Sequence, residues 1–543
     1  MRIEDVGALA PGSVTHADVC IVGSGPAGLV LAEELAREGR RIFVLESGNL
    51  SPCSDADALN EIRSVGAPRV LDQRLVRNRT LGGTSSTWSG RVATFDDMDF
   101  VAREWIPHSG WPIERSTVTP FFPRARAYLM APLVDNNDRE ETAPFSSSQP
   151  QFDDRYLRNY VWSFSTDATS RKDFMRFGPR ARQQPMPGVT CFLNATVTHI
   201  NTTEDGTSAE SVEITGPDRS QRLVRSPYVI LCAGGIENAR LLLTSNRLHR
   251  SGLGNVHDQV GRYLMDHPRG AVGRFRLEDH VALQTSFAAY RLRRGGRTYV
   301  AVPGLALSSA AQHGNQLANC SAWVAGVPCA DDPFVALAAL VQAEGRPLDQ
   351  LRKVWQGRRS FASGIKSVLV DRRSPPRHVA DLELQCMVEQ VPDPDSRVTL
   401  SREKDRYGVP ISQIDWRLGE IEWRTVKHMT EFVAKEFAIT GLPVPDFDDE
   451  VLEGRSLHLP DVAHPTGTTR MSLSPSEGVV DPSCQIHGVH GLYVAGSSLF
   501  PTSGHANPTQ MILALAIRLA DHLTEKLGRH AAPQLRSRHP ERR

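Results

Sequence analysis

The stretch that decides the fold lies near the N-terminus and reads ADVCIVGSGPAGLVLAEELAREGRRIFVLE, residues 17–46. The apolar run at residues 17–22 predicts a buried strand, and the apolar positions after Pro26 recur at helical spacing as far as Gly39. A second apolar run at residues 41–46 predicts another strand. Strand, glycine turn, helix and strand together form one βαβ unit, which predicts a parallel sheet covered by helices.

The turn between the first strand and the helix matches G-x-G-x-x-G at residues 23–28. Its glycines permit a tight turn and a close approach of the backbone to a pyrophosphate, and the start of the helix offers N–H groups to that anion. Glu46 ends the second strand, where an acidic side chain hydrogen-bonds a ribose 2′-hydroxyl and would repel a 2′-phosphate. The unit therefore predicts a dinucleotide site rather than a purely structural turn.

Two later segments predict that the parallel sheet resumes. Residues 228–233 form a buried apolar run before two glycines and a helix, and residues 491–496 form another before a helix that starts at Pro508. Between about 277 and 461 the pattern becomes alternating and rich in turn residues, which is typical of a mixed, mainly antiparallel sheet. We expect an α/β protein with a doubly wound, Rossmann-like domain and a second α+β domain.

The expected domain boundaries follow from this change of pattern. The doubly wound domain is assigned to residues 1–135, 185–276 and 462–528, the second domain to residues 136–184 and 277–461, and a disordered tail to residues 529–543.

Composition excludes several classes of function. The chain has 543 residues, and its 62 Lys and Arg balance 62 Asp and Glu, so no overall positive field attracts nucleic acid or an anionic membrane. No signal peptide is visible, and the longest apolar runs fall short of the roughly 20 residues that span a bilayer. The eight cysteines show no metal or redox spacing. We expect a cytoplasmic protein with no membrane, nucleic-acid or metal partner.

Four further segments carry a resemblance to a known family. They are residues 81–90 (LGGTSSTWSG), 232–240 (CAGGIENAR), 464–471 (HPTGTTRM) and 491–509. Together with the glycine turn they resemble the glucose-methanol-choline (GMC) oxidoreductases over nearly the whole chain, and within that family the pyranose oxidases and the bacterial sugar and glycoside oxidases. The resemblance implies that the dinucleotide is FAD and that the second domain, which binds the substrate, covers its isoalloxazine ring.

The residues expected to bind FAD come from these motifs. They are Gly23, Ser24, Gly25, Pro26, Ala27, Gly28, Glu46, Ser47, Gly82, Gly83, Ser86, Thr87, Trp88, Ser89, Val197, Ala233, Gly234, Gly496, Ser497, Asn507, Pro508 and Thr509. Several family members link FAD covalently through a histidine in G-G-x-S-x-H, and here the sixth position is Thr87. A threonine does not form that bond, so we expect noncovalent FAD.

The resemblance also assigns catalytic positions. The histidine of the family's H-x-x-G-T motif falls on His464, which we expect to be the general base, because neutral imidazole accepts a proton near working pH. The second catalytic position falls on Asn507, whose amide N–H would hydrogen-bond the same substrate oxygen. His505 would line the pocket, replace Asn507, or pack beside the start of the helix.

The expected function is FAD-dependent oxidation of a hydroxyl group of a sugar, glycoside or related polyol to a carbonyl, with hydride transfer to the flavin. The partners are then a small-molecule alcohol and an electron acceptor, either oxygen or another compound. Two alternatives remain open. One is a lyase related to hydroxynitrile lyases, with structural FAD. The other is an oxidase of a nonsugar alcohol of secondary metabolism, with an aminoglycoside-type substrate among the candidates.

Overall fold

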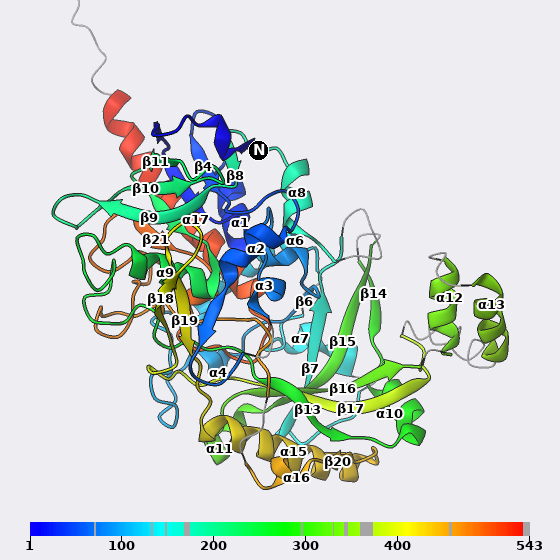
Figure 1. Ribbon diagram of the computed structural model, residues 1–543. Helices are drawn as coiled ribbons and strands as arrows, with labels where there is room; N and C mark the ends of the chain where they lie inside the picture. The colour runs from blue at the N-terminus through cyan, green and yellow to red at the C-terminus, as the bar shows by residue number, and fades with distance from the viewer. Residues whose placement is uncertain are drawn as a thin grey trace, which may run out of the picture.

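The structure is a computed structural model of the chain (Figure 1). It describes residues 1–69, 72–131, 134–146, 149–167, 174–294, 297–329, 331–341, 346–358, 373–455 and 459–535. A parallel sheet occupies the upper part of the view in Figure 1, and a larger antiparallel sheet occupies the lower part.

The parallel sheet confirms the predicted doubly wound architecture. Its six strands run in the order β1 (Arg2–Asp5), β8 (Val189–Leu193), β4 (Ile42–Leu45), β3 (Val19–Val22), β12 (Val229–Leu231) and β21 (Leu492–Val494). Every neighbouring pair is parallel. All residues of β3, β8, β12 and β21 are buried, as expected of strands covered on both faces.

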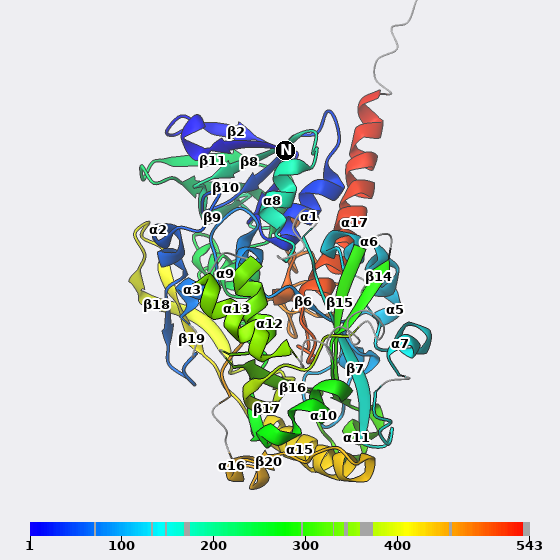
Figure 2. The ribbon, with the colours of Figure 1, turned by 90° about the vertical axis from the view of Figure 1, so that its right-hand side faces the viewer.

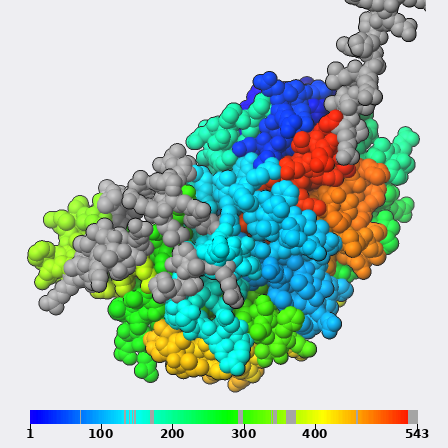
Figure 3. Space-filling model, turned by 180° about the vertical axis from the view of Figure 1, so that it is seen from behind, coloured from blue at the N-terminus to red at the C-terminus, as the bar shows by residue number. Residues whose placement is uncertain are grey.

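Three helices start beside this sheet and position the site. They are α1 (Pro26–Leu35), α9 (Gly234–Thr244) and α17 (Thr509–Leu535). The first turn of α1 contains Pro26, which tolerates the position because the first N–H groups of a helix have no partner within it. The apolar faces of α1 and α17 pack together, and α6 (Phe122–Leu129) covers α17. Seen from behind, α17 (red) lies at the surface beside the N-terminal segment (blue) (Figure 3).

Two small sheets surround α9. One has the order β2 (Val14–His16), β11 (Gln221–Arg225), β10 (Ala209–Thr215) and β9 (Thr196–Thr202). The other has the order β18 (Arg397–Lys404), β19 (Pro410–Asp415) and β5 (Ile62–Ser64). α9 packs against β9 of the first sheet and against β18 and β19 of the second.

The large sheet confirms the predicted antiparallel domain. Its strands are β20 (Asp446–Phe447), β13 (Arg269–Arg274), β17 (Val379–Val388), β16 (Cys320–Pro328), β15 (Arg297–Leu307), β7 (Leu157–Phe164) and β6 (Arg91–Val92) in that order, with β14 (Tyr290–Arg294) paired to β15. Helix α15 (Glu420–Thr440) lies under this sheet in Figure 2. Apolar side chains of α15 and of the sheet, such as Phe437 and Leu384, form a second core there.

The remaining helices are short and lie at the periphery or in connections. They are α2 (Ser54–Asp57), α3 (Gln73–Val76), α4 (Asp97–Phe100), α5 (Arg115–Val118), α7 (Arg139–Ser146), α8 (Phe177–Gln183), α10 (His280–Ser286), α11 (Ser309–Asn315), α12 (Pro333–Val341), α13 (Pro347–Gln356) and α16 (Asp449–Leu452). Within the described ranges, no helix has the length and apolar character needed to cross a bilayer.

The sheets depart from the expected domain boundaries in three places. Strands β6 and β13 were assigned to the doubly wound domain by sequence, yet both belong to the large sheet. Strands β18 and β19 were assigned to the second domain, yet β19 pairs with β5 near the N-terminus. Pairing with a distant strand leaves no local signal in the sequence, so a change of pattern along the chain does not reveal it.

The expectation of a disordered tail from residue 529 is wrong for its first part. Helix α17 continues to Leu535, and residues 536–543 lie outside the described ranges. Extending an existing helix fixes few new dihedral angles per hydrogen bond, and Ala531 and Ala532 have high helix propensity, so the helix can continue past residue 529.

Candidate active site

A cavity of about 540 Å³ lies where β3 and β12 end and where α1, α9 and α17 begin. Most residues predicted to bind the dinucleotide line it. These are Gly23, Ser24, Gly25, Pro26, Ala27, Glu46, Ser47, Gly83, Thr87, Trp88, Ser89, Val197, Ala233, Gly234, Gly496, Ser497, Asn507, Pro508 and Thr509. The catalytic candidate His464 lines the same cavity.

Three predicted residues, Gly28, Gly82 and Ser86, are not among the residues that line the cavity. A Cβ at Gly28 would stand 2.0 Å from the carbonyl oxygen of Gly23, and one at Gly82 would stand 2.3 Å from the nitrogen of Gly178. These two glycines therefore permit close packing of the backbone beside the cavity.

The backbone of the cavity fits a dinucleotide. A Cβ added at Gly25, Gly234 or Gly496 would meet no atom within 4 Å, so these positions leave open space at the wall. Gly25 is the N-cap of α1, and no side chain caps that helix, which leaves its first N–H groups for an anion. Gly23 has a φ of +102°, and a Cβ there would stand 2.6 Å from the carbonyl oxygen of Cys232. A pyrophosphate fits against this glycine turn.

Glu46 lines the cavity and is almost completely buried. Its Oε2 accepts hydrogen bonds from the backbone N–H and the hydroxyl of Ser24, at 3.0 and 2.5 Å, and its Oε1 accepts one from the N–H of Gly48 at 2.8 Å. Burial raises the pKa of Glu46, and these hydrogen bonds oppose the rise. The carboxylate thus holds the glycine turn in place, and Oε1 retains a lone pair for a ribose hydroxyl.

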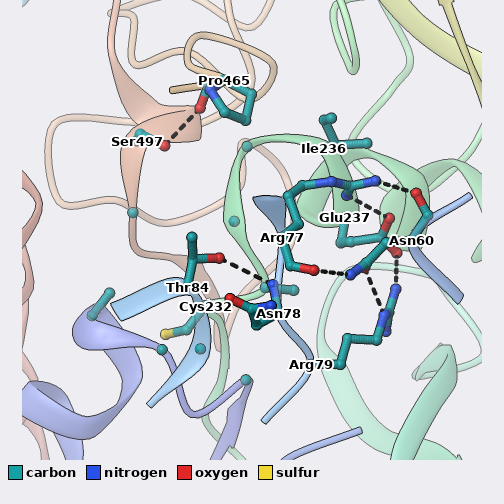
Figure 4. Close-up of a pocket in the computed structure, with 18 of the residues that line it drawn as sticks. Asn60, Arg77, Asn78, Arg79, Thr84, Cys232, Ile236, Glu237, Pro465 and Ser497 are labelled. Atoms are coloured by element: carbon teal, nitrogen blue, oxygen red, sulfur yellow. Dashed lines mark hydrogen bonds and ion pairs between the residues drawn. The ribbon is translucent and has the colours of Figure 1, made fainter. Parts of the chain in front are cut away.

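A second charged cluster, which the sequence analysis missed, forms another wall of the cavity (Figure 4). Glu237 forms ion pairs with Arg77 (3.2 Å), Arg79 (2.7 Å) and Arg240 (3.1 Å), and Arg240 also pairs with Asp405 (2.7 Å). The three arginines hold the pKa of Glu237 well below its ordinary value. The cluster joins the residue 77–79 segment to α9 and to the β18–β19 turn.

The backbone and the side chain of His464 each have a partner in the buried interior. Its backbone N–H donates to the carboxylate of Asp266 at 3.0 and 3.1 Å, and its Nδ1 lies 2.9 Å from Nδ1 of His267. Asp266 and Asp461 each bind Nη2 of Arg69, at 2.5 and 2.6 Å, and all three side chains are fully buried. The backbone of His464 is therefore anchored to a buried ion cluster of Arg69, Asp266 and Asp461.

The hydrogen bonds of His267 determine which nitrogen of His464 carries the proton. His267 Nε2 lies 3.2 Å from the carbonyl oxygen of Ser503, which only accepts, so His267 is protonated at Nε2. Neutral His267 then presents an unprotonated Nδ1, to which His464 donates from its own Nδ1. Nε2 of His464 keeps its lone pair, and it makes no hydrogen bond with the described part of the chain. The arrangement presents a proton acceptor at the cavity.

Burial and charge keep both histidines neutral. Burial, with help from the neighbouring His267, lowers the pKa of His464 to about 3, although Asp266 opposes the shift. Burial likewise lowers the pKa of His267. His464 is therefore in its base form throughout the neutral pH range.

Asn507 and His505 differ in position although they are close in sequence. Asn507 lines the cavity, and its buried Oδ1 has no hydrogen-bond partner in the described structure, so its amide is available to a ligand. His505 is fully buried outside the cavity lining, with Nε2 3.3 Å from Asp96 and its ring 4.8 Å from that of Tyr160. Of the three positions considered for His505, the structure supports packing beside the start of the helix.

The comparisons with known proteins agree with this geometry. Residues 392–516 match a family model described as GMC oxidoreductase, and residues 16–61 match one described as FAD binding domain. In these two segments the chain is similar to the GMC oxidoreductases and to FAD-binding domains. FAD is accordingly the dinucleotide that the cavity accommodates.

Among the relatives is the C-glycoside 3-oxidase of Microbacterium trichothecenolyticum, 27% identical over 63% of the chain; the match spans about half of that relative (55%). The 6′′′-hydroxyparomomycin C oxidase of Streptomyces lividus is 23% identical over 96% of the chain and 95% of the relative. The crystal structure of a formate oxidase has the same fold, with a TM-score of 0.55 and 18% identity over 95% of this chain and 99% of that one.

Several site residues had no usable signal in the sequence. His267 follows Asp266 in a short Asp-His-Pro segment, but nothing in its spacing connects it with His464, which lies 197 positions away. Arg69 precedes no recognisable motif. Arg91 directly follows the Trp88-Ser89-Gly90 segment and lines the cavity, and its proximity to that segment was the one available indication.

Proposed function

We propose that this protein oxidises a hydroxyl group of a sugar, glycoside or related polyol to a carbonyl, with FAD as a noncovalent cofactor. The observation that carries the proposal is that His464, whose Nδ1 is engaged by His267, lines the same cavity as the glycine turn, which leaves its Nε2 as the proton acceptor. A proton acceptor beside a flavin site is what oxidation of an alcohol requires.

In this proposal some residues of the cavity bind and orient the substrate, and His464 accepts its proton. Bound FAD would supply the acceptor for the hydride that leaves the alcohol carbon. His464 Nε2 takes the hydroxyl proton, and the amide N–H of Asn507 donates to the same oxygen and so orients the C–H bond. The start of α17, at Pro508 and Thr509, contributes a positive helix end that stabilises negative charge developing in the cavity.

Noncovalent attachment is supported by the position of Thr87. Its hydroxyl donates to the side-chain oxygen of Asn78 at 2.6 Å, and threonine offers no nitrogen for the linkage that a histidine makes. The neighbouring Ser89 and Trp88 complete that wall of the cavity.

The substrate class is supported by the relatives, because the names of two of them specify oxidases of a glycoside and of an aminoglycoside. The electron acceptor of the second half of the reaction is oxygen or another compound. We also propose a cytoplasmic location, supported by eight free cysteines, of which Cys320 and Cys386 lie close together without forming a disulfide.

The test is anaerobic reduction of the flavin. The purified yellow protein is mixed without oxygen with a panel of polyols, glycosides and aminoglycosides, and the visible absorbance of the flavin is followed. Bleaching by one or more alcohols is expected. A protein that splits its substrate while the flavin stays oxidised would be a lyase with structural FAD, and the proposal would be wrong.

A further inference from the structure

The half-buried Arg91 lines the cavity, and the described residues offer it no counter-charge. Arg91 starts β6, and its Cζ lies 4.1 Å from the ring centroid of Trp162 and 4.3 Å from that of Trp323. Its Nε is buried and has no hydrogen-bond partner. Within the described ranges, its side chain forms no ion pair, although it shares the cavity with His464 and Asn507.

A second arginine faces the same tryptophan. Arg269 begins β13, two residues after His267, and its Cζ lies 5.5 Å from the ring centroid of Trp323. The two cations lie near one another because both face the ring of Trp323, and burial together with repulsion from Arg269 lowers the pKa of Arg91 to about 9. Arg91 shares the cavity lining with His464, and Arg269 lies two residues after His267, the partner of His464, at the exposed start of β13.

The carboxylates of the site do not neutralise this pair of arginines. Asp266 and Asp461 both bind Arg69 in the buried cluster beneath His464. For Arg269, as for Arg91, the described residues provide no ion-pair partner. Two adjacent cations with no carboxylate between them repel each other, and the more buried one also loses hydration, so their presence costs stability.

An uncompensated charge in a binding cavity is typical of a site that pairs with a ligand of the opposite charge. Arginine forms two parallel hydrogen bonds to a carboxylate or phosphate group, and the flat tryptophan rings keep the guanidinium in place without taking up its N–H groups. We propose that the alcohol substrate carries an oxyanion group, a carboxylate or a phosphate, which Arg91 and Arg269 bind while its reacting hydroxyl lies at His464. This inference rests on the proposed function and narrows its substrate class.

Binding is measured first, independently of turnover. The FAD-loaded protein is titrated calorimetrically with D-glucose, D-glucuronate and D-glucose 6-phosphate, which share one ring and differ at carbon 6, and with acetate and inorganic phosphate as the anions alone. At least one anionic sugar should bind about tenfold or more tightly than glucose, and added salt should weaken that preference. The better of the two anionic sugars identifies the oxyanion group.

The variants Arg91→Met and Arg269→Met test the two arginines. Each should reduce the preference for the anion about tenfold or more, and ligand-free Arg91→Met should melt no lower than the wild type because it removes an unpaired charge. Arg358→Met is the matched control, since Arg358 lies 5.2 Å from the ring of Trp355 and outside the cavity. It should leave the preference unchanged.

Three results overturn the inference: no anionic probe binds more tightly than glucose, the preference survives both substitutions, or Arg91→Met loses much of its melting temperature. If a neutral glycoside bleaches the flavin while the anions show no preference, the proposed oxidation stands and only this inference falls. If the anions bind through Arg91 and no alcohol ever bleaches the flavin, the anion site is supported and the proposed oxidation is wrong.

Discussion

Replacing His267 tests whether one histidine sets the proton position of another. In His267→Leu, the Nδ1–H of His464 loses its hydrogen-bond acceptor. The His464 tautomer that is protonated at Nδ1 and free at Nε2 is then no longer stabilised over the other tautomer. In His267→Asn, the side-chain oxygen falls near the place of the lost Nδ1 and accepts the same hydrogen bond. The leucine variant removes the interaction, and the asparagine variant preserves it.

The magnitude follows from the hydrogen bond that is lost. A buried donor left without a partner costs about 1–3 kcal/mol, and that cost falls on the reactive tautomer of His464. At about 1.4 kcal/mol per factor of ten, His267→Leu should reduce flavin roughly 5- to 150-fold more slowly than the wild type. His267→Asn should recover most of that loss.

The assay is stopped-flow reduction without oxygen, using an alcohol that bleaches the wild-type flavin, on enzymes of equal FAD content. With a His464 pKa of about 3, the base form is complete above roughly pH 5, so the wild-type rate should be flat from about pH 5 to 9 and should fall only in more acid solution. Removing His267 removes one cause of that low pKa. In His267→Leu the decline should therefore begin at higher pH.

A purely structural His267 would give a different pattern. Both substitutions would then lower FAD content or rate to the same extent at every pH, and asparagine would not restore activity. That result would refute the tautomer argument.

Four further predictions concern the cofactor and the reacting groups. His464→Ala should retain FAD and slow flavin reduction about 10²–10⁴-fold, whereas Asn507→Ala should slow it less; a His464→Ala enzyme within about threefold of the wild type would remove this residue from the mechanism. Because Thr87 replaces the linking histidine, acid precipitation should leave FAD in the supernatant, and yellow colour in the washed pellet would contradict noncovalent binding. Gly25→Val should weaken FAD binding in equilibrium dialysis with little change in apoprotein melting, since its side chain would enter open cavity; unchanged affinity would mean that the dinucleotide lies elsewhere. Glu46→Gln should lower FAD affinity about tenfold or more by losing charge-assisted hydrogen bonds, and full FAD retention by a folded variant would count against a role for Glu46.

The sequence predicted those parts of the site that are encoded locally. The glycine turn at residues 23–28 and Glu46 belong to one βαβ unit whose geometry follows from spacing alone, and the H-x-x-G-T segment carried His464 by family resemblance. All of these line the cavity except Gly28, which packs beside it. Strands β3, β4, β12 and β21 of the parallel sheet were predictable because apolar runs mark them, whereas β1 and β8 were not predicted.

The remaining parts depend on contacts between distant segments. His267 meets His464 across 197 positions, and β19 pairs with β5 although they are more than 300 residues apart. His505 shows the opposite case, in which residues close in sequence lie in different surroundings. Its place two residues before Asn507 suggested a shared pocket, but the backbone turns its side chain toward Asp96, on another segment. Neither kind of relation is visible in a single sequence.

The order of strands in the parallel sheet has a consequence for biosynthesis. Strand β12 lies between β3, made early, and β21, whose last residue is Val494, so one edge of the sheet stays open until most of the chain has left the ribosome. Helix α17, which closes the cavity at Pro508 and Thr509, emerges later still. The nascent chain therefore exposes an unpaired strand edge until β21 has been made, and the pocket for the flavin is completed only when α17 follows. Yellow colour in a preparation of this protein thus reports that translation and folding have both reached the C-terminal helix.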